Sequence, residues 1–475
     1  MKELPDLSQL SPEAKDALIV QLWSLVQAQA RQIEQLTAKV KELEARLSLN
    51  SQNSSKPPSS DGLNKPKPKS LRKPGQRPSG GQKGHPGRTL RQVAEPDEVI
   101  VHAISAVCDA CQTRLEASLR PGFRQVFDLP EPRIHVTEHR VEQAVCSCGK
   151  LHVAKFPEDV TSAVHYGPVA QAAMVHLSHH QMLPLRRTSE LMEQMLGLPV
   201  SEASVLQACA NAAQRLTPTV QSIAQAIHQS LVVHADETGL RVGKTLNWMH
   251  VAVTDSLTWM ARHPQRGTPA FASFGILPEF KGVLVHDGWK PYRALECDHG
   301  LCNAHHLREL TYVHEQLEQA WAGDMIALLV QAHHQVAQHH LLPPHRLAHL
   351  RHVYDTLLEV ADEHNPRNPP VEGQRGRVKQ SKAVNLIGRL RDYADDVWRF
   401  ATDPGVPFTN NIAEQAIRMP KVKQKISGCF RTESGADIFC TIRSYAATMA
   451  KQGANVFHCL VQAFRGATPQ PAGVA

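Results

Sequence analysis

Apolar residues recur at spacings of three and four along residues 17–50. They form an a/d seam over about four heptads, interrupted by the polar residue Gln29. The other faces are polar and a polar segment follows. The pattern therefore favours a leucine-zipper-like coiled coil between copies of the chain over a helix packed on its own core. The seam consists of Ile19, Leu22, Val26, Gln29, Ile33, Leu36, Val40, Leu43 and Leu47.

The periodicity ends in residues 51–95, where Ser, Pro, Gly and Lys dominate. Between Lys56 and Arg91, ten Lys or Arg residues are accompanied by one acid, Asp61. This composition predicts a flexible basic linker. Its charge fits a polyanionic partner such as DNA, and it fits a solvated tether equally well.

Residues 96–160 contain two close pairs of cysteines. Cys108-x-x-Cys111 is followed 35 residues later by Cys146-x-Cys148. Short loops that each carry two thiolates can direct four sulfur atoms at one Zn²⁺ ion. We therefore predict a zinc-binding module with a structural Zn²⁺, and incidental reduced cysteines are the alternative.

Residues 163–229 have a helical pattern. It breaks at Gly197, Leu198 and Pro199, and Ser201 is placed to cap the helix that follows. Within residues 186–215, a DNA-binding helix-turn-helix and an ordinary helical hairpin fit equally well.

Residues 230–300 change to a pattern of short strands. An apolar run in "SLVVHADETGL" ends at Asp236, and "TLNWMHVAVT" and "LTWMARH" predict two further strands. A helical piece, "GTPAFASFG", precedes a fourth strand that ends at Asp287. If the first and fourth strands are neighbours in a sheet, Asp236 and Asp287 lie side by side. Each aspartate also fits a turn.

A third acid, Glu414, lies early in a helix near the end of the chain. Asn411-x-x-Glu414 fits a capping box with Asn411 at the N-cap. Two strand-end aspartates and a later helical carboxylate are also ligands with which two Mg²⁺ or Mn²⁺ ions support phosphodiester cleavage and transfer. Taken together, the three acids favour this metal site. The cations that follow, which would contact phosphates, are Lys421, Lys423, Lys425 and Arg431.

Several motifs resemble those of transposases of the insertion sequence sixty-six family. They are "HADET", "HDGWKPY", "CNAHHLREL", "NNIAEQAIR" and "SGCFRTESGA", with "NSSKPPSSD" and "GGQKGHPG" nearer the start. The resemblance, which extends to about residue 462, implies an α/β RNase H-like core whose catalytic DDE trio falls on Asp236, Asp287 and Glu414. It also implies a bacterial mobile element and accessory transposition proteins. Gln415 departs from the family, which usually has arginine there, and this puts a DNA contact in doubt.

The 127 positions from Asp287 to Glu414 are more than the simple fold needs. We therefore predict a helical insertion over residues 301–405, and the last core helices over residues 406–465. Cys302 and His305 begin the insertion as a Cys-x-x-His pair. A related motif in other RNase H-like transposases suggests that this pair lies near the active site or target DNA; a buried cysteine beside a hydrogen-bonded histidine is the alternative. Asn411 is a further candidate for support of the active site. A solvated face explains the insertion's many histidines better than a metal cluster does. These are His333, His334, His339, His340, His345, His349 and His352.

The length of 475 residues predicts two to four domains. Neither a membrane-spanning apolar run nor a signal-peptide core is evident, so we expect a cytoplasmic bacterial protein, associated with the nucleoid when active. The expected function is that of a DNA transposase that binds element ends, cleaves strands and joins them to target DNA as a homo-oligomer. The alternatives are a non-catalytic zinc and coiled-coil DNA-binding regulator, and an RNase H-like nuclease without strand transfer.

Overall fold

The computed structural model describes residues 10–54, 61, 90–116, 123–157, 160–339, 341–369, 376 and 378–474. Most of the predicted basic linker, and His340, lie outside these residues. The chain divides into two units. The larger contains Met1–Lys69, Pro157–Glu190 and Val200–Ala475, and the smaller contains Ser70–Phe156 and Leu191–Pro199.

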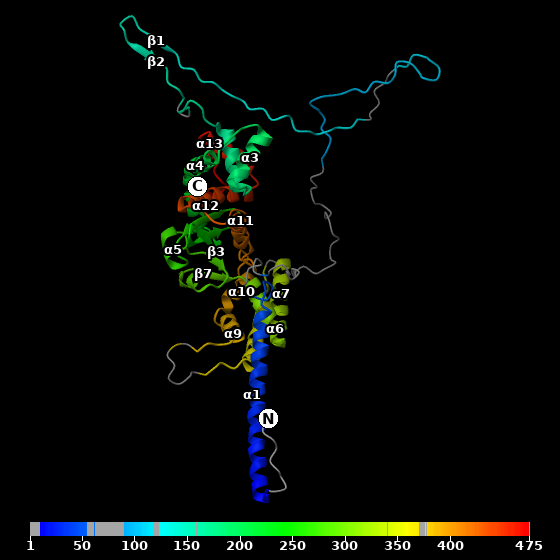
Figure 1. The fold of residues 1–475 in the computed structure, drawn as a ribbon, viewed down its shortest axis with the longest axis vertical. Helices are drawn as coiled ribbons and strands as arrows, with labels where there is room; N and C mark the ends of the chain where they lie inside the picture. The colour runs from blue at the N-terminus through cyan, green and yellow to red at the C-terminus, as the bar shows by residue number, and fades with distance from the viewer. Residues whose placement is uncertain are drawn as a thin grey trace. The chain divides into compact units, whose positions relative to one another are not determined.

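A five-stranded mixed sheet forms the centre of the larger unit (Figure 1). The strands are β3 (Val232–Val242), β4 (Thr245–Val253), β5 (Thr258–His263), β6 (Val283–His286) and β7 (Asp298–Leu301), in the spatial order β5-β4-β3-β6-β7. The first three are antiparallel neighbours, whereas β6 and β7 run parallel to β3. This arrangement confirms the three predicted strands, the helix α5 (Thr268–Phe274) and the fourth strand. Strand β7 was not predicted.

Helices cover both faces of this sheet. Helices α11 (Asn411–Ser427) and α12 (Glu433–Lys451) pack on one face, against side chains that include Leu240 and Val242 of β3. On the other face, Val233 and Ala235 of β3 pack with α5 and with the end of α4 (Glu202–His228). Because side chains alternate along a strand, the even-numbered residues of β3 face α11 and the odd-numbered residues face away from it.

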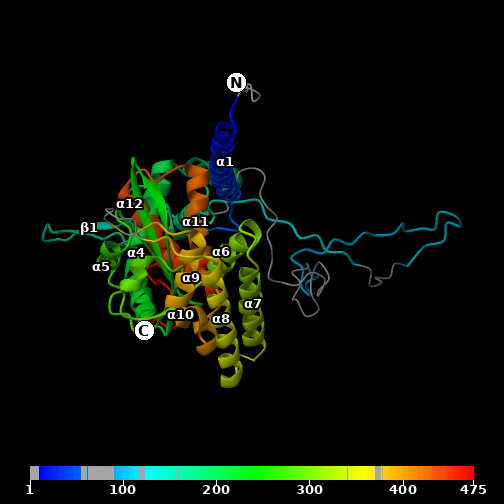
Figure 2. The ribbon, with the colours of Figure 1, turned by 90° about the horizontal axis from the view of Figure 1, so that it is seen from below.

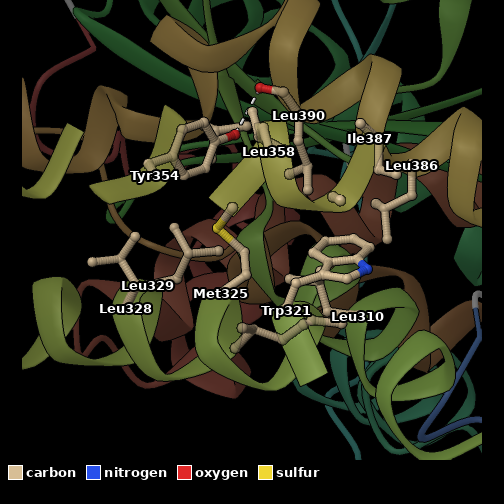
Figure 3. Close-up of a cluster of buried hydrophobic side chains, with 14 of the residues drawn as sticks. Leu310, Trp321, Met325, Leu328, Leu329, Tyr354, Leu358, Leu386, Ile387 and Leu390 are labelled. Carbon is tan, nitrogen blue, oxygen red and sulfur yellow. Dashed lines mark hydrogen bonds between the residues drawn. The ribbon is translucent and has the colours of Figure 1, made fainter. Parts of the chain in front are cut away.

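Five helices lie in sequence between β7 and α11. They are α6 (Asn303–Gln316), α7 (Ala320–His339), α8 (Pro344–His364), α9 (Lys382–Asp392) and α10 (Ala394–Thr402). Helices α7 and α8 lie side by side (Figure 2). Their shared core contains Trp321, Met325 and Leu329, and the buried Tyr354 hydroxyl donates a 2.7 Å hydrogen bond to the Leu390 carbonyl (Figure 3). A continuous apolar core therefore holds these helices together.

The histidines of this helical region do not form a metal cluster among the described residues. His333 is half-buried and stacks on Phe408 with 4.4 Å between ring centroids. His339, His345 and His349 are exposed to solvent. The structure is thus consistent with the solvated face inferred for most of them.

Helices α2 (Pro168–Val175), α3 (Leu185–Leu196), α4 and the short π-helix η3 (His176–His180) occupy the segment predicted to be helical. The break after α3 is present, with Gly197 at a φ of 67°. Ser201 caps α4, because its hydroxyl accepts a 3.0 Å hydrogen bond from the Ser204 amide. Helix α13 (Val456–Phe464) follows α12 and contacts α2 and α4.

The seam of the predicted zipper, from Ile19 to Leu47, lies within one long helix, α1 (Pro12–Leu47), with Ser11 at its N-cap, and the helix ends three residues before the predicted segment does. Ala45, near its end, is buried in the core of the helical region. Most seam positions are exposed; Ile19 and Ile33, for example, each retain 63% of their accessible surface. Contacts within the chain therefore leave most of this apolar seam uncovered in the part of α1 that the structure describes.

The smaller unit contains a hairpin of β1 (Gln143–Val145) and β2 (Leu151–Val153). An isolated bridge between Val107 and Arg114 closes a second turn. No side chain among residues 90–116 and 123–156 is buried, and Val99, Ile100 and Val126 are largely exposed. The described parts of this segment have no apolar core of their own.

Across the described ranges of the chain, every helix is too short or too polar to pass through a lipid bilayer.

Candidate active site

Strands β3 and β6 bring Asp236 and Asp287 to the same level of the sheet. Their parallel pairing joins Val232 to Val283 and ends with His234 opposite Val285. Asp236 and Asp287 each lie two residues beyond this last pair, Asp236 within β3 and Asp287 one residue past the end of β6, and they are near enough for the Asp287 carboxylate to raise the pKa of Asp236. Val232 packs with Val283 and Val285 on one face, and the alternation of side chains puts both aspartates on that face.

Asp236 is not at the end of its strand, contrary to the sequence-based expectation. Strand β3 continues to Val242, because β4 pairs with it along this whole stretch and Asp236 lies opposite Val251. The pairing with β6, in contrast, stops at His234. Asp236 therefore lies where one neighbouring strand ends and the other continues, which leaves its side chain partly accessible.

Helix α11 brings Glu414 to the same face. Ala413 and Ile417 of this helix are buried against β3 and β4. The Glu414 side chain is 23% exposed, and its Oε1 atom is buried without a hydrogen-bond partner. The structure therefore gathers the three acids that the sequence singled out.

The proximity of these carboxylates has an electrostatic consequence. Burial raises the pKa of Asp236 well above its usual value, and the carboxylates of Glu237, Asp287 and Glu414 raise that pKa further. The Asp236 Oδ1 atom accepts one hydrogen bond, from the Glu237 amide at 2.8 Å. A bound cation would permit these acids to be ionised together, and carboxylate oxygens are the ligands that Mg²⁺ prefers.

Glu237 lies on the opposite face of β3 and fixes the loop that follows Asp287. Its Oε2 atom accepts a 2.5 Å hydrogen bond from the Tyr292 hydroxyl, and its Oε1 atom accepts a 3.0 Å bond from Arg266 Nε. The Arg266 guanidinium lies over the ring of Trp289, 3.9 Å from its centroid. Burial raises the pKa of Glu237, whereas the hydrogen bonds from Tyr292 and Arg266 oppose this rise. The sequence analysis missed this residue, although it directly follows Asp236.

Asn410 joins the start of α11 to β3. Its side-chain amide donates to the Ala235 carbonyl at 2.8 Å, and a 2.9 Å hydrogen bond links its Oδ1 atom to His234 Nδ1. Its backbone amide donates to Cys302 Sγ at 3.2 Å. This buried residue therefore positions the turn that carries Glu414.

The capping box centred on Asn411 is absent. The helix begins at Asn411 with Asn410 as its N-cap residue, and no side chain makes a capping hydrogen bond. Asn411 itself is exposed, whereas its neighbour Asn410 is buried and makes the contacts with β3 and Cys302. Capping accordingly does not engage the Glu414 carboxylate.

Cys302 and His305 lie beside Glu414. The His305 Nδ1 atom is 4.0 Å from Glu414 Oε1, and ligand atoms of all three residues lie within 4.8 Å of one another. Burial and Arg308 lower the pKa of His305, whereas Glu414 and Asp287 oppose this change. The Cys-x-x-His pair thus borders the carboxylate cluster.

The four predicted phosphate-binding cations differ in their exposure to solvent. Lys421 is exposed, and its Nζ atom donates a 2.8 Å hydrogen bond to the Gly239 carbonyl. Burial lowers the pKa of Lys423, which lies near Cys209 of α4. Lys425 and Arg431 are exposed. Lys423 lies two positions from both Lys421 and Lys425 on α11 and so points in a different direction, whereas Lys421 and Lys425, four positions apart, share a helix face.

The predicted zinc ligands lie in the two turns of the smaller unit. Hydrogen bonds with Thr113 and Cys108 lower the pKa of Cys111, and hydrogen bonds with Cys148 and Ser147 lower that of Cys146. Each pair is thus close together. Among the described residues, the group of three or more ligands gathered within 4.8 Å is Cys302, His305 and Glu414, and does not include these thiols.

Comparisons with known families agree with these observations. The model of the family described as "Transposase IS66 family" matches residues 163–438, which is more than half of the chain. A family of unknown function (DUF6444) matches residues 2–91. No curated protein matches the chain.

The carboxylate cluster predicts how stability depends on pH in metal-free protein. Because the pKa of Asp236 is raised, the folded state binds this proton more tightly than the unfolded chain does. The stabilisation that comes from this bound proton is complete below the ordinary pKa of aspartate. It is lost as the pH rises toward the pKa that Asp236 has in the folded protein. We therefore expect Asp236→Asn to raise the melting temperature in EDTA, by an increment that grows between pH 5 and pH 8.

Thermal unfolding of both proteins across this pH range measures the increment. Asp324→Asn, a change at an exposed position of α7, is the matched control and should leave the profile unchanged. An Asp236→Asn protein that melts at or below the wild-type temperature at every pH would contradict the predicted electrostatic cost.

Proposed function

The chain belongs to the IS66 family of transposases, and we propose that it is a DDE-type enzyme that binds insertion sequence ends, cleaves their strands and joins them to target DNA. The observation that carries this proposal is the convergence of Asp236, Asp287 and Glu414 on one face of the central sheet. A protein that only binds DNA does not require these acids in one place.

The sheet supports an RNase H-like catalytic core. Three antiparallel strands are followed by two strands parallel to the first, so that the first and fourth strands are neighbours. Helix α11 returns to the same sheet after the long helical region, as the proposed insertion requires. We accordingly assign residues 230–300 and 406–465 to the core, and residues 301–405 to the insertion.

The donor set fits Mg²⁺ or Mn²⁺. The three side chains offer hard oxygen ligands, Glu414 Oε1 is buried without a partner, and the Asp236 carboxylate is destabilised by its neighbours. When bound, two such ions would activate the attacking oxygen and stabilise the leaving oxygen of a phosphodiester. Asp236, Asp287 and Glu414 are the residues that would hold them.

The surrounding side chains keep these acids in place. Asp287 Oδ1 accepts a 2.9 Å hydrogen bond from the Trp289 amide, and the contacts of Glu237 hold the same loop. The contacts of Asn410 fix the first turn of α11 against β3. These groups would preserve the spacing of the acids while DNA binds and leaves.

We assign DNA contacts to the exposed Lys425 and Arg431, to the basic linker and to residues 163–229. Each phosphate contact would add to a salt-dependent affinity. Lys423 would act mainly by holding α11, since it is partly withdrawn from solvent, and the exposed Lys421 would tie α11 to β3 through its bond to the Gly239 carbonyl beside any phosphate contact. Accessory proteins encoded by the same element would assist, as the family resemblance implies.

The first prediction concerns catalysis. Asp236→Asn, Asp287→Asn and Glu414→Gln should each reduce cleavage and joining of end-bearing DNA by roughly a thousandfold or more, because the acids act as one unit. Affinity for the same DNA should change by no more than about twofold, because no positive charge is lost. Cleavage with Mg²⁺ or Mn²⁺ and a gel shift, run on the same preparation, measure the two effects.

Glu359→Gln, at an exposed position of α8, is the matched control and should retain full activity. A Glu414→Gln protein that still cuts at the wild-type rate would refute the assignment of the third acid. Cleavage without joined products on supercoiled target DNA would identify a nuclease instead of a transposase.

The second prediction concerns Cys108, Cys111, Cys146 and Cys148. They should bind one Zn²⁺, and because the described parts of residues 96–160 show no apolar core, the module's order should depend on that ion. Cys111→Ser should lower the zinc content by about one equivalent and make this segment sensitive to protease. Cys429→Ser, which alters an exposed cysteine of the larger unit, should do neither. Unchanged zinc in Cys111→Ser protein would exclude the module.

The third prediction concerns the seam of α1, which should be covered by a second copy of the chain. Replacing Leu36 and Leu43 with glutamate places charge in that seam, where burial is costly, and should lower the mass in solution toward that of a monomer. Ala28→Glu with Gln35→Glu, at the same spacing outside the seam, is the matched control. An unchanged mass by light scattering after the seam substitutions would rule out the coiled coil.

A further inference from the structure

Three residues with different metal-binding chemistry converge at the edge of the carboxylate cluster. The Cys302 thiol, the His305 imidazole and the Glu414 carboxylate have ligand atoms that all lie within 4.8 Å of one another. Cys302 and His305 come from the junction of β7 with α6, and Glu414 comes from the first turn of α11. A Cys-x-x-His pair alone supplies two ligands, which are too few for a zinc site, and the fold brings Glu414 beside them as a third.

The His305 imidazole and the Glu414 carboxylate each have one buried atom that makes no hydrogen bond. His305 Nδ1 and Glu414 Oε1 both lack a partner although both atoms are withdrawn from solvent. They are 4.0 Å apart, which is too long for a hydrogen bond between them. Buried polar atoms are normally satisfied, so two such atoms that face each other indicate that a ligand belongs between them.

The third group is held rigidly. The Cys302 amide donates to the His286 carbonyl at 2.9 Å, and Cys302 Sγ accepts a hydrogen bond from the Asn410 amide at 3.2 Å. An N–H donor to sulfur is a typical outer contact of a metal-bound thiolate, because it orients the ligand and spreads its charge. The same asparagine fixes the turn that carries Glu414, so Cys302 and Glu414 share one support, and the His305 amide donates to the Cys302 carbonyl at 3.1 Å.

We propose that Cys302, His305 and Glu414 form a transition-metal site, for Zn²⁺ in particular, that shares Glu414 with the carboxylate cluster. Sulfur and nitrogen ligands select zinc over magnesium. Zn–S and Zn–N bonds of about 2.3 and 2.0 Å require the ligand atoms to approach by roughly 1 Å. The His305 and Glu414 side chains remain 19% and 23% exposed, so the ion can enter and a fourth position stays open.

This proposal does not depend on the catalytic role of Glu414. Its test measures metal content, and so its failure would leave the assignment of the three catalytic acids unaffected. Conversely, a loss of DNA cleavage without a loss of zinc content would support the catalytic role of the three acids and would count against the zinc site.

The experiment measures zinc in the full-length protein by elemental analysis after saturation with Zn²⁺ and removal of loosely bound metal. With the cysteine module occupied as well, the wild-type chain should retain about two equivalents. His305→Ala and Cys302→Ser should each lose about one of them, whereas Cys111→Ser should lose the other. The double variant Cys111→Ser and His305→Ala should retain almost none.

His314→Ala, on the same helix, and Cys297→Ser, just before β7, are the matched controls and should keep the wild-type content. His305 is partly exposed, so its variant should fold even if Cys302→Ser does not, and circular dichroism verifies this. Unchanged zinc in folded His305→Ala protein would overturn the proposal.

Discussion

The candidate site depends on the register in which β3 pairs with β6. A shift by one residue would carry one of the aspartates to the opposite face of the sheet, because side chains alternate along a strand. Gly282, just before β6, permits this pairing. A Cβ atom there would lie 2.8 Å from the carbonyl oxygen of Ser230, just before β3, so a side chain would force the two segments apart. A Cβ atom at Gly300 of β7 would lie 3.0 Å from the Val406 side chain, so this glycine leaves room for the valines that pack on the sheet.

The register brings buried acids close together, which lowers the stability of the folded protein when they are ionised, and other interactions must offset this loss. Burial and neighbouring carboxylates disfavour the ionised form of Asp236. The opposing interactions lie in the surrounding core. Valines pack on the same face of the sheet as the aspartates. Glu237 binds Arg266 and Tyr292 on the opposite face, and Asn410 ties α11 to β3. An unfavourable cluster of buried carboxylates that several surrounding interactions hold in place is typical of functional sites.

The sequence predicts those parts of the fold that local signals determine. The strands β3, β4 and β5 were recognisable because apolar runs are separated by turn residues near Gly243 and Asp255. Strand β7 was not, since its residues Asp298–Leu301 lack such a run and form a strand through pairing with β6. Tertiary contacts likewise decide where α11 begins. Asn410 and Asn411 suit a helix start equally, and the contacts of Asn410 with β3 and Cys302 select one.

The acids of the candidate site were predictable and their neighbours were not. Each acid was singled out because its residue type suits phosphodiester chemistry and follows a strand or begins a helix. Glu237 and Asn410 act through contacts that join distant segments, and no spacing in the sequence reveals such contacts. The separation of Lys423 from Lys421 and Lys425, in contrast, follows from helical geometry and could have been foreseen.

In the two metal sites that we propose, Glu414 is a ligand of both, and the two sets of ligands prefer different ions. Asp236 and Asp287 offer oxygen, which suits a hard cation, whereas Cys302 and His305 offer sulfur and nitrogen, which suit a softer one. Any ion bound by one set alters the charge and orientation of the carboxylate that the other set needs. By linkage, the effect of zinc on magnesium affinity must equal the effect of magnesium on zinc affinity. If the Glu414 carboxylate binds both ions at once, each ion should raise the affinity for the other. If it can bind only one ion at a time, each ion should lower the affinity for the other. With Glu414 fixed at the first turn of α11 by Asn410, the metal bound by the Cys-x-x-His pair would therefore influence which ions the carboxylate cluster binds.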